Sequence, residues 1–275
     1  MTKTIAVMSM MVVLITGMAS DAKSVEQMNE EQRAEALAKQ LANPVAALIS
    51  VPFQLNYDAD IGPFDEGERW TLNIQPVVPF SISENWNLIS RTILPVISQD
   101  DIFPGAGSQD GIGDILQSLF FSPKGPTDSG WILGVGPVLL FPTGSDDLLT
   151  TDKWGAGPTA VALRQQGPLT YGALVNHIWS YAGEDQRTDV NATFLQPFFN
   201  YTTKSALSFV LQTETTYDWE TEEWSVPVNF LVAKVSRLGG QMFSWGGGVR
   251  YWADSPDSRP EGFGARVIFT LLFPK

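Results

Sequence analysis

From Pro44 to the end of the chain, extended apolar segments alternate with breaks rich in Gly, Pro and polar residues. Within the segments, apolar and polar residues alternate, as in WTLNIQ at 70–75, where the apolar residues share one face and the polar residues share the other. A period of two is typical of β-strands with one apolar face. The pattern predicts about twelve strands. They are expected at 48–57, 69–82, 85–97, 112–122, 130–141, 154–165, 169–181, 190–202, 206–219, 223–236, 242–252 and 262–273.

The connections between these segments differ in length according to their order along the chain. The odd connections are long and acidic, as in DADIGPFDEGE and SQDDIFPGAGSQD, whereas the even ones are short, as in SEN and QGP. In a bacterial outer-membrane barrel whose chain starts in the periplasm, odd connections form the long outer loops and even ones form tight periplasmic turns. A soluble β-sandwich has no reason to sort its loops in this way. The pattern therefore favours a membrane barrel.

The nine Trp residues support this prediction, because none lies in the middle of a predicted strand. Six of them fall beside long connections and three fall beside short ones. Aromatic rings with a polar tip favour the headgroup layers of a membrane. The sequence therefore predicts two aromatic girdles. The first comprises Trp70, Trp154, Trp179, Trp219, Trp224 and Trp252, and the second comprises Trp86, Trp131 and Trp245.

The first residues have the pattern of a secretory signal peptide. Lys3 precedes an apolar run at 5–15, and small residues allow cleavage after Ala22. The apolar run is shorter than the roughly 20 residues of a transmembrane helix. The sequence therefore predicts a signal peptide at 1–22, a periplasmic N-terminal helical segment at 23–43 and an outer-membrane barrel at 44–275.

Residues 24–41 have apolar side chains at helical spacing and predict one amphipathic helix. Ser24 and Gln27 would form its capping box, and Pro44 would follow its end. The polar composition favours a solvated helix ahead of the barrel. A plug and a partner-binding arm are the alternatives.

The composition excludes several classes of function. The chain of 275 residues has a net charge of -13, which argues against a nucleic-acid binder because such proteins need a cationic surface. The absence of Cys excludes thiol nucleophiles, thiolate metal sites and disulfides. One His does not provide the imidazole cluster of a zinc site. The sequence therefore predicts no metal site and no cofactor.

The single His also gives little support for catalysis. His177 and Ser180 are three positions apart, so they point to opposite faces of an ideal strand. Barrel phospholipases use a His and a Ser two residues after it, a spacing that His177 and Ser180 do not have. The sequence therefore predicts that the protein is not an enzyme.

Strand alternation places a set of polar residues inside the barrel, where the polar faces of outer-membrane strands point. Arg250 and Arg266 lie on the last two predicted strands and are expected to be neighbours. With Glu214 they would form either a charged constriction or a structural ion-pair cluster. The predicted lumen residues are Gln54, Asn73, Gln75, Arg91, Gln212, Glu214, Asn229, Arg250 and Arg266.

Acidic residues gather in the long connections and are expected to ring the outer mouth. They would form a solvated rim, bias a pore toward cations or bind Ca²⁺ through oxygen ligands. No connection has the spacing of a defined calcium motif, so a solvated rim is favoured. The predicted mouth residues are Asp100, Asp101, Asp146, Asp147, Glu184 and Asp185.

Several prolines fall inside predicted strands, although Pro cannot donate a hydrogen bond to the ladder. They lie at similar height above the turns, so the sequence predicts a belt of β-bulges. If they end strands instead, the sheet is divided into shorter pieces. These residues are Pro52, Pro76, Pro95, Pro137, Pro158, Pro197 and Pro227.

Segments spread along the chain carry a family resemblance: LAKQLANPVAALISVPFQLNYD, GERWTLNIQPVVP, NWNLISRTILPVI, FPGAGSQDGIGDILQS, WGAGPTAVAL, DVNATFLQPFFNYTT, GVRYW and FTLLFPK. They resemble a Gram-negative outer-membrane β-barrel family whose members are labelled transporters or phenol meta-pathway degradation-type proteins, and sometimes neuromedin U. The resemblance covers nearly all of the chain after the predicted signal peptide. It implies an outer-membrane location, a barrel fold and a transport role.

We therefore expect an all-β protein: a transmembrane antiparallel β-barrel of about twelve strands with a short N-terminal helix, in the outer membrane of a Gram-negative bacterium. The expected function is a passive pore or uptake channel, with outer-membrane lipid and a small solute as partners. The alternative is a non-conducting barrel with a structural or partner-binding role. The pattern does not define the solute or the oligomeric state.

Overall fold

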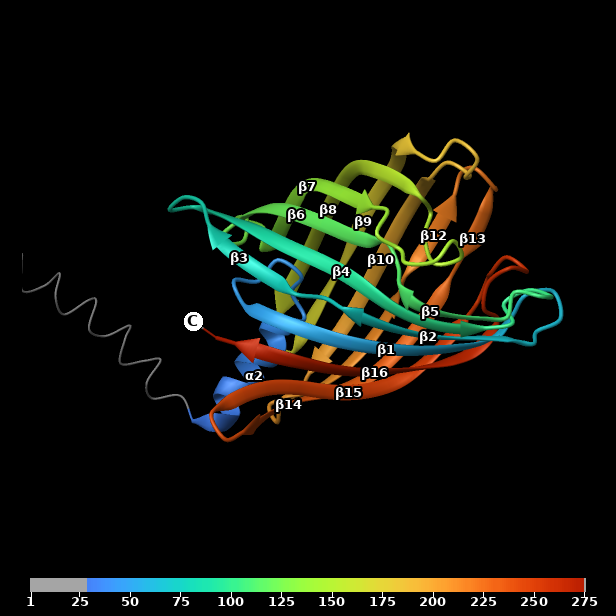
Figure 1. Cartoon of the computed structure of the whole chain (residues 1–275). Helices are drawn as coiled ribbons and strands as arrows, with labels where there is room; N and C mark the ends of the chain where they lie inside the picture. The colour runs from blue at the N-terminus through green and yellow to red at the C-terminus, as the bar shows by residue number, and fades with distance from the viewer. Residues whose placement is uncertain (1–28, 275) are drawn as a thin grey trace, which may run out of the picture.

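The alternating segments form a closed antiparallel barrel in the computed structural model, which describes residues 29–274 (Figure 1). The barrel closes where the first strand pairs with the last. Four strands are each divided into two segments, so the sixteen segments form twelve strands. The predicted fold class and strand number are confirmed. The elements are α2 (Glu30–Leu41), β1 (Ile49–Ile61), β2 (Gly67–Ile74), β3 (Val77–Ser81), β4 (Trp86–Asp100), β5 (Ser108–Ile112), β6 (Ile115–Pro123), β7 (Trp131–Phe141), β8 (Lys153–Gln166), β9 (Leu169–Gly183), β10 (Asn191–Thr202), β11 (Leu207–Thr213), β12 (Thr215–Asp218), β13 (Glu223–Ser225), β14 (Pro227–Leu238), β15 (Gln241–Trp252) and β16 (Gly262–Phe273).

All four divided strands are interrupted at or opposite a proline, and three of these breaks leave the pairing register unchanged. Pro76 separates β2 from β3, Pro227 begins β14, and Glu214, which separates β11 from β12, donates its backbone N–H to Pro227 over 3.2 Å. The pairing register is the same on both sides of each of these three breaks. The predicted bulges at Pro76 and Pro227 are therefore wrong. A missing donor interrupts the ladder but adds no residue to the strand.

A bulge divides the fourth of these strands, between β5 and β6. The pairing with β4 shifts by one residue across Gly113 and Asp114. The Asp114 carboxylate accepts hydrogen bonds from Thr150 and Thr151, at 2.6 to 2.8 Å. The bulge therefore anchors the long connection between β7 and β8.

Large apolar side chains cover the outer face of the barrel. Val135, Val249 and Val267 are more than half exposed, and many Phe and Leu residues lie on the same surface. Trp side chains lie on this surface near both ends of the strands, including Trp70 and Trp245. An apolar outer band flanked by aromatic residues is what a barrel in a bilayer presents to lipid.

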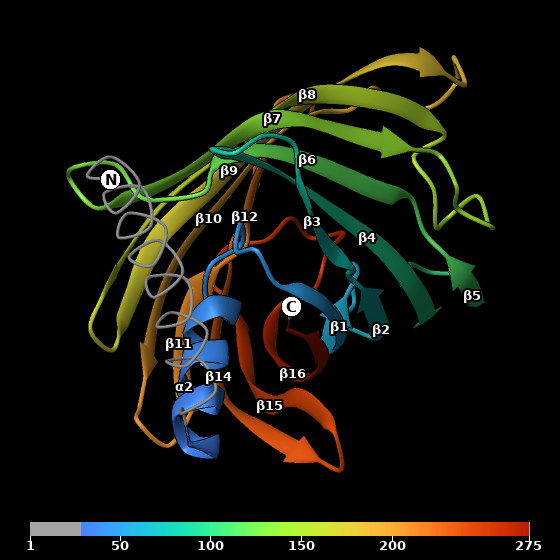
Figure 2. The same ribbon diagram turned by 90° about the vertical axis from the view of Figure 1, so that its left-hand side faces the viewer.

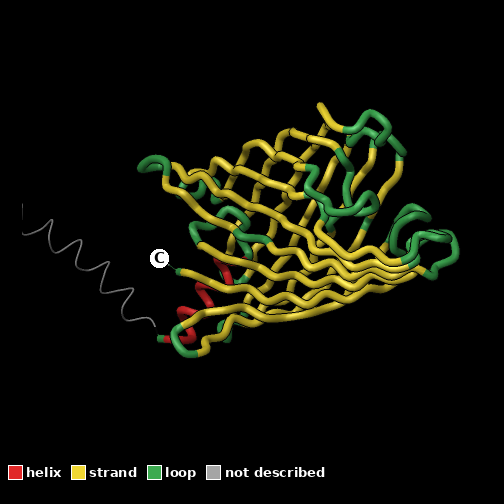
Figure 3. The backbone as a smooth tube through the Cα atoms, in the orientation of Figure 1, coloured by secondary structure: helices red, strands yellow, loops and turns green. Residues whose placement is uncertain are grey.

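The long connections lie at one end of the barrel and the short connections lie at the other. Figure 3 shows the loops that follow β1, β4 and β15 together at the end opposite the helix. The end of β16 and the connections after β8 and β14 lie at the helix end, because neighbouring strands are antiparallel. The predicted sorting of the loops is present in the fold.

Helix α2 begins with a capping box, in which the Asn29 side chain accepts from the Gln32 backbone and the Gln32 side chain accepts from the Asn29 backbone. The predicted capping residues, Ser24 and Gln27, lie outside the described residues. Seen from its end of the barrel, the helix lies within the ring of strands (Figure 2). No helix among residues 29–274 is long and apolar enough to span a membrane.

The helix packs against the inside of the barrel wall. Leu37 and Ala38 are buried together with Val235, Met242 and Leu272, whose side chains point inward by strand alternation. The Gln165 side chain donates a 2.8 Å hydrogen bond to the Lys39 carbonyl at the C-terminal turn. The favoured interpretation of a solvated helix is therefore wrong for residues 30–41, because the apolar face of the helix completes a core with the barrel.

Candidate functional site

The centre of the lumen contains a buried arginine bound to a carboxylate. Arg266 on β16 donates two hydrogen bonds to Glu214, at 2.8 and 2.7 Å, and a third to the Asn56 side-chain oxygen at 2.6 Å. Arg266 is 1% exposed. A bidentate pair with a third hydrogen bond satisfies both charges, which burial in the lumen requires.

A second ion pair lies next to the first. Arg250 on β15 donates to Asp58 on β1 over 3.2 Å. Trp252 donates its indole N–H to the other Asp58 oxygen at 2.9 Å, and the Arg250 guanidinium lies 4.5 Å from the Trp252 ring centre. Trp252 therefore belongs to the lumen cluster, and its predicted place in the outer girdle is wrong.

Glycines lie opposite both arginines, and Gly264 provides the space that the second ion pair needs. Gly248 on β15 is paired with Arg266, and Gly264 on β16 is paired with Arg250. A Cβ atom at Gly264 would lie 2.9 Å from the Asp58 carboxylate and 2.5 Å from the Tyr57 carbonyl. A residue with a side chain there would displace the carboxylate that Arg250 binds. The contacts of Arg250 and Trp252 with Asp58 therefore depend on Gly264 on the neighbouring strand.

Arg91 on β4, which is separated from β16 by β1 and β2, adds a third arginine to this layer. Its guanidinium donates to the Gln75 side-chain oxygen over 2.9 Å and forms no ion pair within the described part of the chain. Glu214 is close enough for Arg91, Arg250 and Arg266 all to act on its charge. Gln212 adds a 3.1 Å hydrogen bond to Glu214 and accepts one from Gln196. The layer therefore consists of three groups of hydrogen-bonded polar side chains in the lumen.

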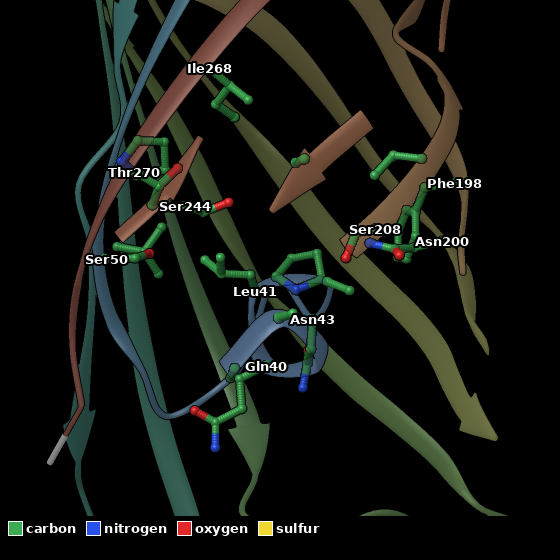
Figure 4. A pocket seen from close by; sticks show the side chains of 18 of the residues that line it. Gln40, Leu41, Asn43, Ser50, Phe198, Asn200, Ser208, Ser244, Ile268 and Thr270 are labelled. Atoms are coloured by element: carbon green, nitrogen blue, oxygen red, sulfur yellow. The ribbon is translucent and has the colours of Figure 1, made fainter. Parts of the chain in front are cut away.

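Below this layer lies a cavity of about 250 Å³. Its floor is the end of α2 and the residues that follow, and Figure 4 shows Leu41 pointing into it. Small polar residues surround Leu41, and larger apolar side chains line the walls between them and the arginine layer. The small polar residues are Ser50, Asn200, Ser208, Ser244 and Thr270. The end of the helix therefore lies on one side of the cavity, and Arg91 and Glu214 of the charged layer line another side.

Another part of the lumen, next to the cavity, is apolar. Ile89, Phe120, Leu163 and Leu174 are buried in one cluster with Val45, which follows the helix. Outer-membrane barrels with aqueous pores have polar interiors. This wall therefore narrows the lumen and excludes water from part of it.

A chain of side-chain hydrogen bonds continues above the arginine layer. Arg69 donates to Gln99 over 2.8 Å, Gln99 donates to Gln109 over 2.9 Å, and Gln109 donates to the Ala106 carbonyl over 2.6 Å. This chain ties the loop between β4 and β5 to the lumen wall.

The structure brings together most of the predicted lumen residues. Arg91, Glu214, Arg250 and Arg266 meet in the charged layer. The cavity is lined by Gln54, Gln75, Arg91, Gln212 and Glu214. Asn73 is opposite Gln54 and shares its inward face, but it does not line the cavity. Asn229 is completely buried opposite Arg250, and its side-chain oxygen has no hydrogen-bond partner.

The predicted mouth residues lie in separate loops. Asp100 ends β4 and Asp101 follows it, Asp146 and Asp147 lie between β7 and β8, and Glu184 and Asp185 lie between β9 and β10. Among residues 29–274, no three His, Cys, Asp or Glu side chains are grouped so that they could hold a metal. Arg187 in the last of these loops donates to Asp152 over 2.8 Å. The loops are therefore joined by ion pairs between acidic and basic residues.

The side chain of Asp189, in the loop between β9 and β10, has a lowered pKa. Hydrogen bonds from Lys153 and from Ser180 lower the pKa of Asp189. Ser180 is therefore engaged with Asp189, at 3.1 Å, while His177 contacts Thr193 at 2.7 Å. His177 and Ser180 do not form a dyad.

Sequence reasoning did not assign Asp58, Trp252 or Gly264 to the site. Asp58 could have been found, because it continues the inward alternation of Gln54 and Asn56 on β1. Gly264 could not, because its role depends on which residue of the neighbouring strand faces Arg250.

No protein-family model matches the chain, and no curated protein matches it. The chain is similar in structure to an outer membrane channel from Pseudomonas putida F1, with 13% sequence identity and a TM-score of 0.65 over 82% of this chain and 96% of that one. It is less similar to the NanC porin, with 12% identity and a TM-score of 0.48 over 82% and 100% of the two chains. It is also similar to an outer membrane phospholipase from Salmonella typhi, with 10% identity and a TM-score of 0.48 over 90% and 99%. At 13% identity, the likeness to the channel shows the fold alone, which is that of an outer-membrane β-barrel.

We expect Glu214→Gln to destabilise the barrel, because it leaves Arg266 buried without a counter-charge. Breaking a buried ion pair costs about 3 to 5 kcal/mol. The double variant Glu214→Gln/Arg266→Gln should recover part of this loss. Thermal unfolding of the purified protein in detergent, followed by circular dichroism, measures both.

The exposed variant Glu223→Gln is the matched control, since surface substitutions usually change stability by about 0.5 kcal/mol or less. An unchanged unfolding midpoint for Glu214→Gln would show that the pair does not brace the lumen.

Proposed function

We propose that the protein is an outer-membrane channel for small solutes and that this conformation is its closed state. The observation that carries the proposal is the cavity between α2 and the arginine layer. A purely structural barrel has no need for a hollow between its helix and a charged layer. The family resemblance of the sequence and the likeness of the fold to a channel support the same function.

In the proposed mechanism, α2 is the part that moves. Its contacts with the barrel comprise a small buried core around Leu37 and Ala38, one hydrogen bond from Gln165 and an exposed ion pair of 3.4 Å between Glu30 and Arg237. These contacts are few compared with the continuous ladder of the barrel. Segments with few buried contacts open at the lowest free-energy cost. Withdrawal of α2 would connect the cavity to the helix end of the barrel.

The second closure is the charged layer. Arg266 and Glu214 are fixed by three strong hydrogen bonds, so this layer would act as a filter and not as the moving part. Solutes would pass beside the pairs, along Arg91 and the glutamines. The lumen arginines would favour anions there, whereas the acidic loops outside would attract cations.

The buried apolar cluster around Phe120 and Leu174 favours a second candidate, a non-conducting barrel filled by its own side chains. The two candidates differ in conductance, which is why the experiment below measures it.

We expect the mature protein in planar bilayers to show small, infrequent conductance steps, and removal of residues 29–43 to make the steps larger or longer, because the cavity floor is lost. Leu37→Asp should act in the same direction, since a buried charge expels the helix from its apolar contacts. The measurement is single-channel recording at fixed voltage.

The control is Glu30→Gln, which breaks only the exposed ion pair to Arg237 and should leave the conductance unchanged. Absence of conductance in the mature protein and in both helix variants would contradict the channel proposal and favour the filled barrel.

We also expect the long loops to face outward in the outer membrane. The chain has no Cys, so a single Cys introduced at Asp146 or Asp257 provides a unique label. A membrane-impermeant thiol reagent should label these positions on intact cells but should not label a Cys at Glu84 or Gly167, in the short turns. Equal labelling of both sets would contradict the proposed orientation.

A further inference from the structure

Arg91 differs from the other arginines of the lumen in what it contacts. Arg250 and Arg266 are each bound to a carboxylate, whereas Arg91 forms no ion pair within residues 29–274. Arg91 also lines the cavity. A cation without a counter-ion in a partly buried site is costly, so the site favours an incoming anion.

The Glu214 carboxylate, although nearby, does not act as the counter-ion of Arg91. Both oxygens of Glu214 are held by Arg266, at 2.8 and 2.7 Å, and one of them also accepts from Gln212. The Glu214 charge is therefore directed at Arg266. The charged layer contains Arg91, Arg250 and Arg266 but only two carboxylates, Asp58 and Glu214, so this part of the lumen has an excess of positive charge inside an acidic protein.

Gln75 provides a second polar group beside Arg91. Its side-chain oxygen accepts from Arg91 at 2.9 Å, which orients its amide nitrogen away from the guanidinium. This nitrogen has no hydrogen-bond partner within the described chain, and the residue lines the cavity. One guanidinium and one amide donor together match the two oxygens of a carboxylate.

The rest of the cavity wall is mostly apolar. Val77, Phe198, Val210, Leu231 and Ile268 line it between the arginine layer and the hydroxyl groups near α2. The volume of about 250 Å³ is below the roughly 300 to 1,000 Å³ of sites for drug-sized molecules. The site therefore has room for one small molecule with one charged end.

We propose that this cavity binds small amphipathic monocarboxylates, with the carboxylate on Arg91 and Gln75 and an aromatic or branched apolar group against Phe198 and Ile268. This inference rests on the proposed function, because it names the class of solute that the same lumen carries. A single negative charge suits a site with a single unpaired cation, and an apolar group suits walls that offer few hydrogen bonds.

The test is isothermal titration calorimetry of the purified mature protein in detergent, with benzoate as the probe. Benzyl alcohol has a similar size without the charge, and benzylamine has the opposite charge. We expect benzoate to bind most tightly and benzylamine most weakly. Arg91→Gln should weaken benzoate binding by about tenfold or more, because a hydrogen bond to a charged group is lost, and should change benzyl alcohol binding by less than about threefold.

Two further variants separate direct contact from other effects. Gln75→Glu places a carboxylate 2.9 Å from Arg91, so it should fill the site from within and weaken benzoate binding as Arg91→Gln does, while the fold keeps a satisfied pair. Arg69→Gln removes the same charge from the lumen outside the cavity and should weaken benzoate binding by less than about threefold. If Arg91→Gln does not fold, Gln75→Glu decides the question.

Equal affinity for benzoate and benzyl alcohol, or no binding of either, would overturn the proposal, as would unchanged benzoate binding in Gln75→Glu. Conductance is measured separately. A protein that conducts but does not bind benzoate would contradict this inference alone, whereas a protein that binds benzoate but never conducts would contradict the proposed function.

Discussion

The ion pair between Arg266 and Glu214 is the interaction on which the interior of this barrel depends. A barrel of about eight strands is filled by its own side chains, whereas one with more strands encloses space that must be filled or hydrated. Here the bidentate pair joins β16 to the junction of β11 and β12 across the lumen. The space is thereby divided into a polar layer above and a cavity below. The other polar groups of the layer lie around this ion pair; they are Arg250, Asp58, Arg91 and the surrounding glutamines.

The strand number and the inward face of most strands could be predicted, because both follow from the period of two and from turn composition. Alternation was sufficient to place Glu214, Arg250 and Arg266 on the inside. It could not identify their partners, since the pairing of Arg250 with Asp58 depends on the register between β15, β16 and β1.

The helix and the prolines show where local patterns stop being informative. The polar composition of α2 favours solvent, but its narrow apolar face around Leu37 matches the inward residues of β14 and β16, which only the closed barrel brings together. Pro76 and Pro227 each remove a ladder donor, yet the barrel keeps its register across both positions because strong pairing on either side fixes it. The requirement for a closed sheet outweighs the local preference for a bulge.

The central claim is that α2 closes a cavity that the arginine layer bounds from the other side. Ser208 lies in this cavity beside Asn200 and is the place to test it (Figure 4). The measurement is the rate at which a small thiol reagent modifies Ser208→Cys, the only thiol in the chain, in the purified protein and in the same protein without residues 29–43. The account predicts slow modification when the helix is present and much faster modification when it is absent. Equal rates in the two proteins would contradict it, because the helix would then not control access to the cavity.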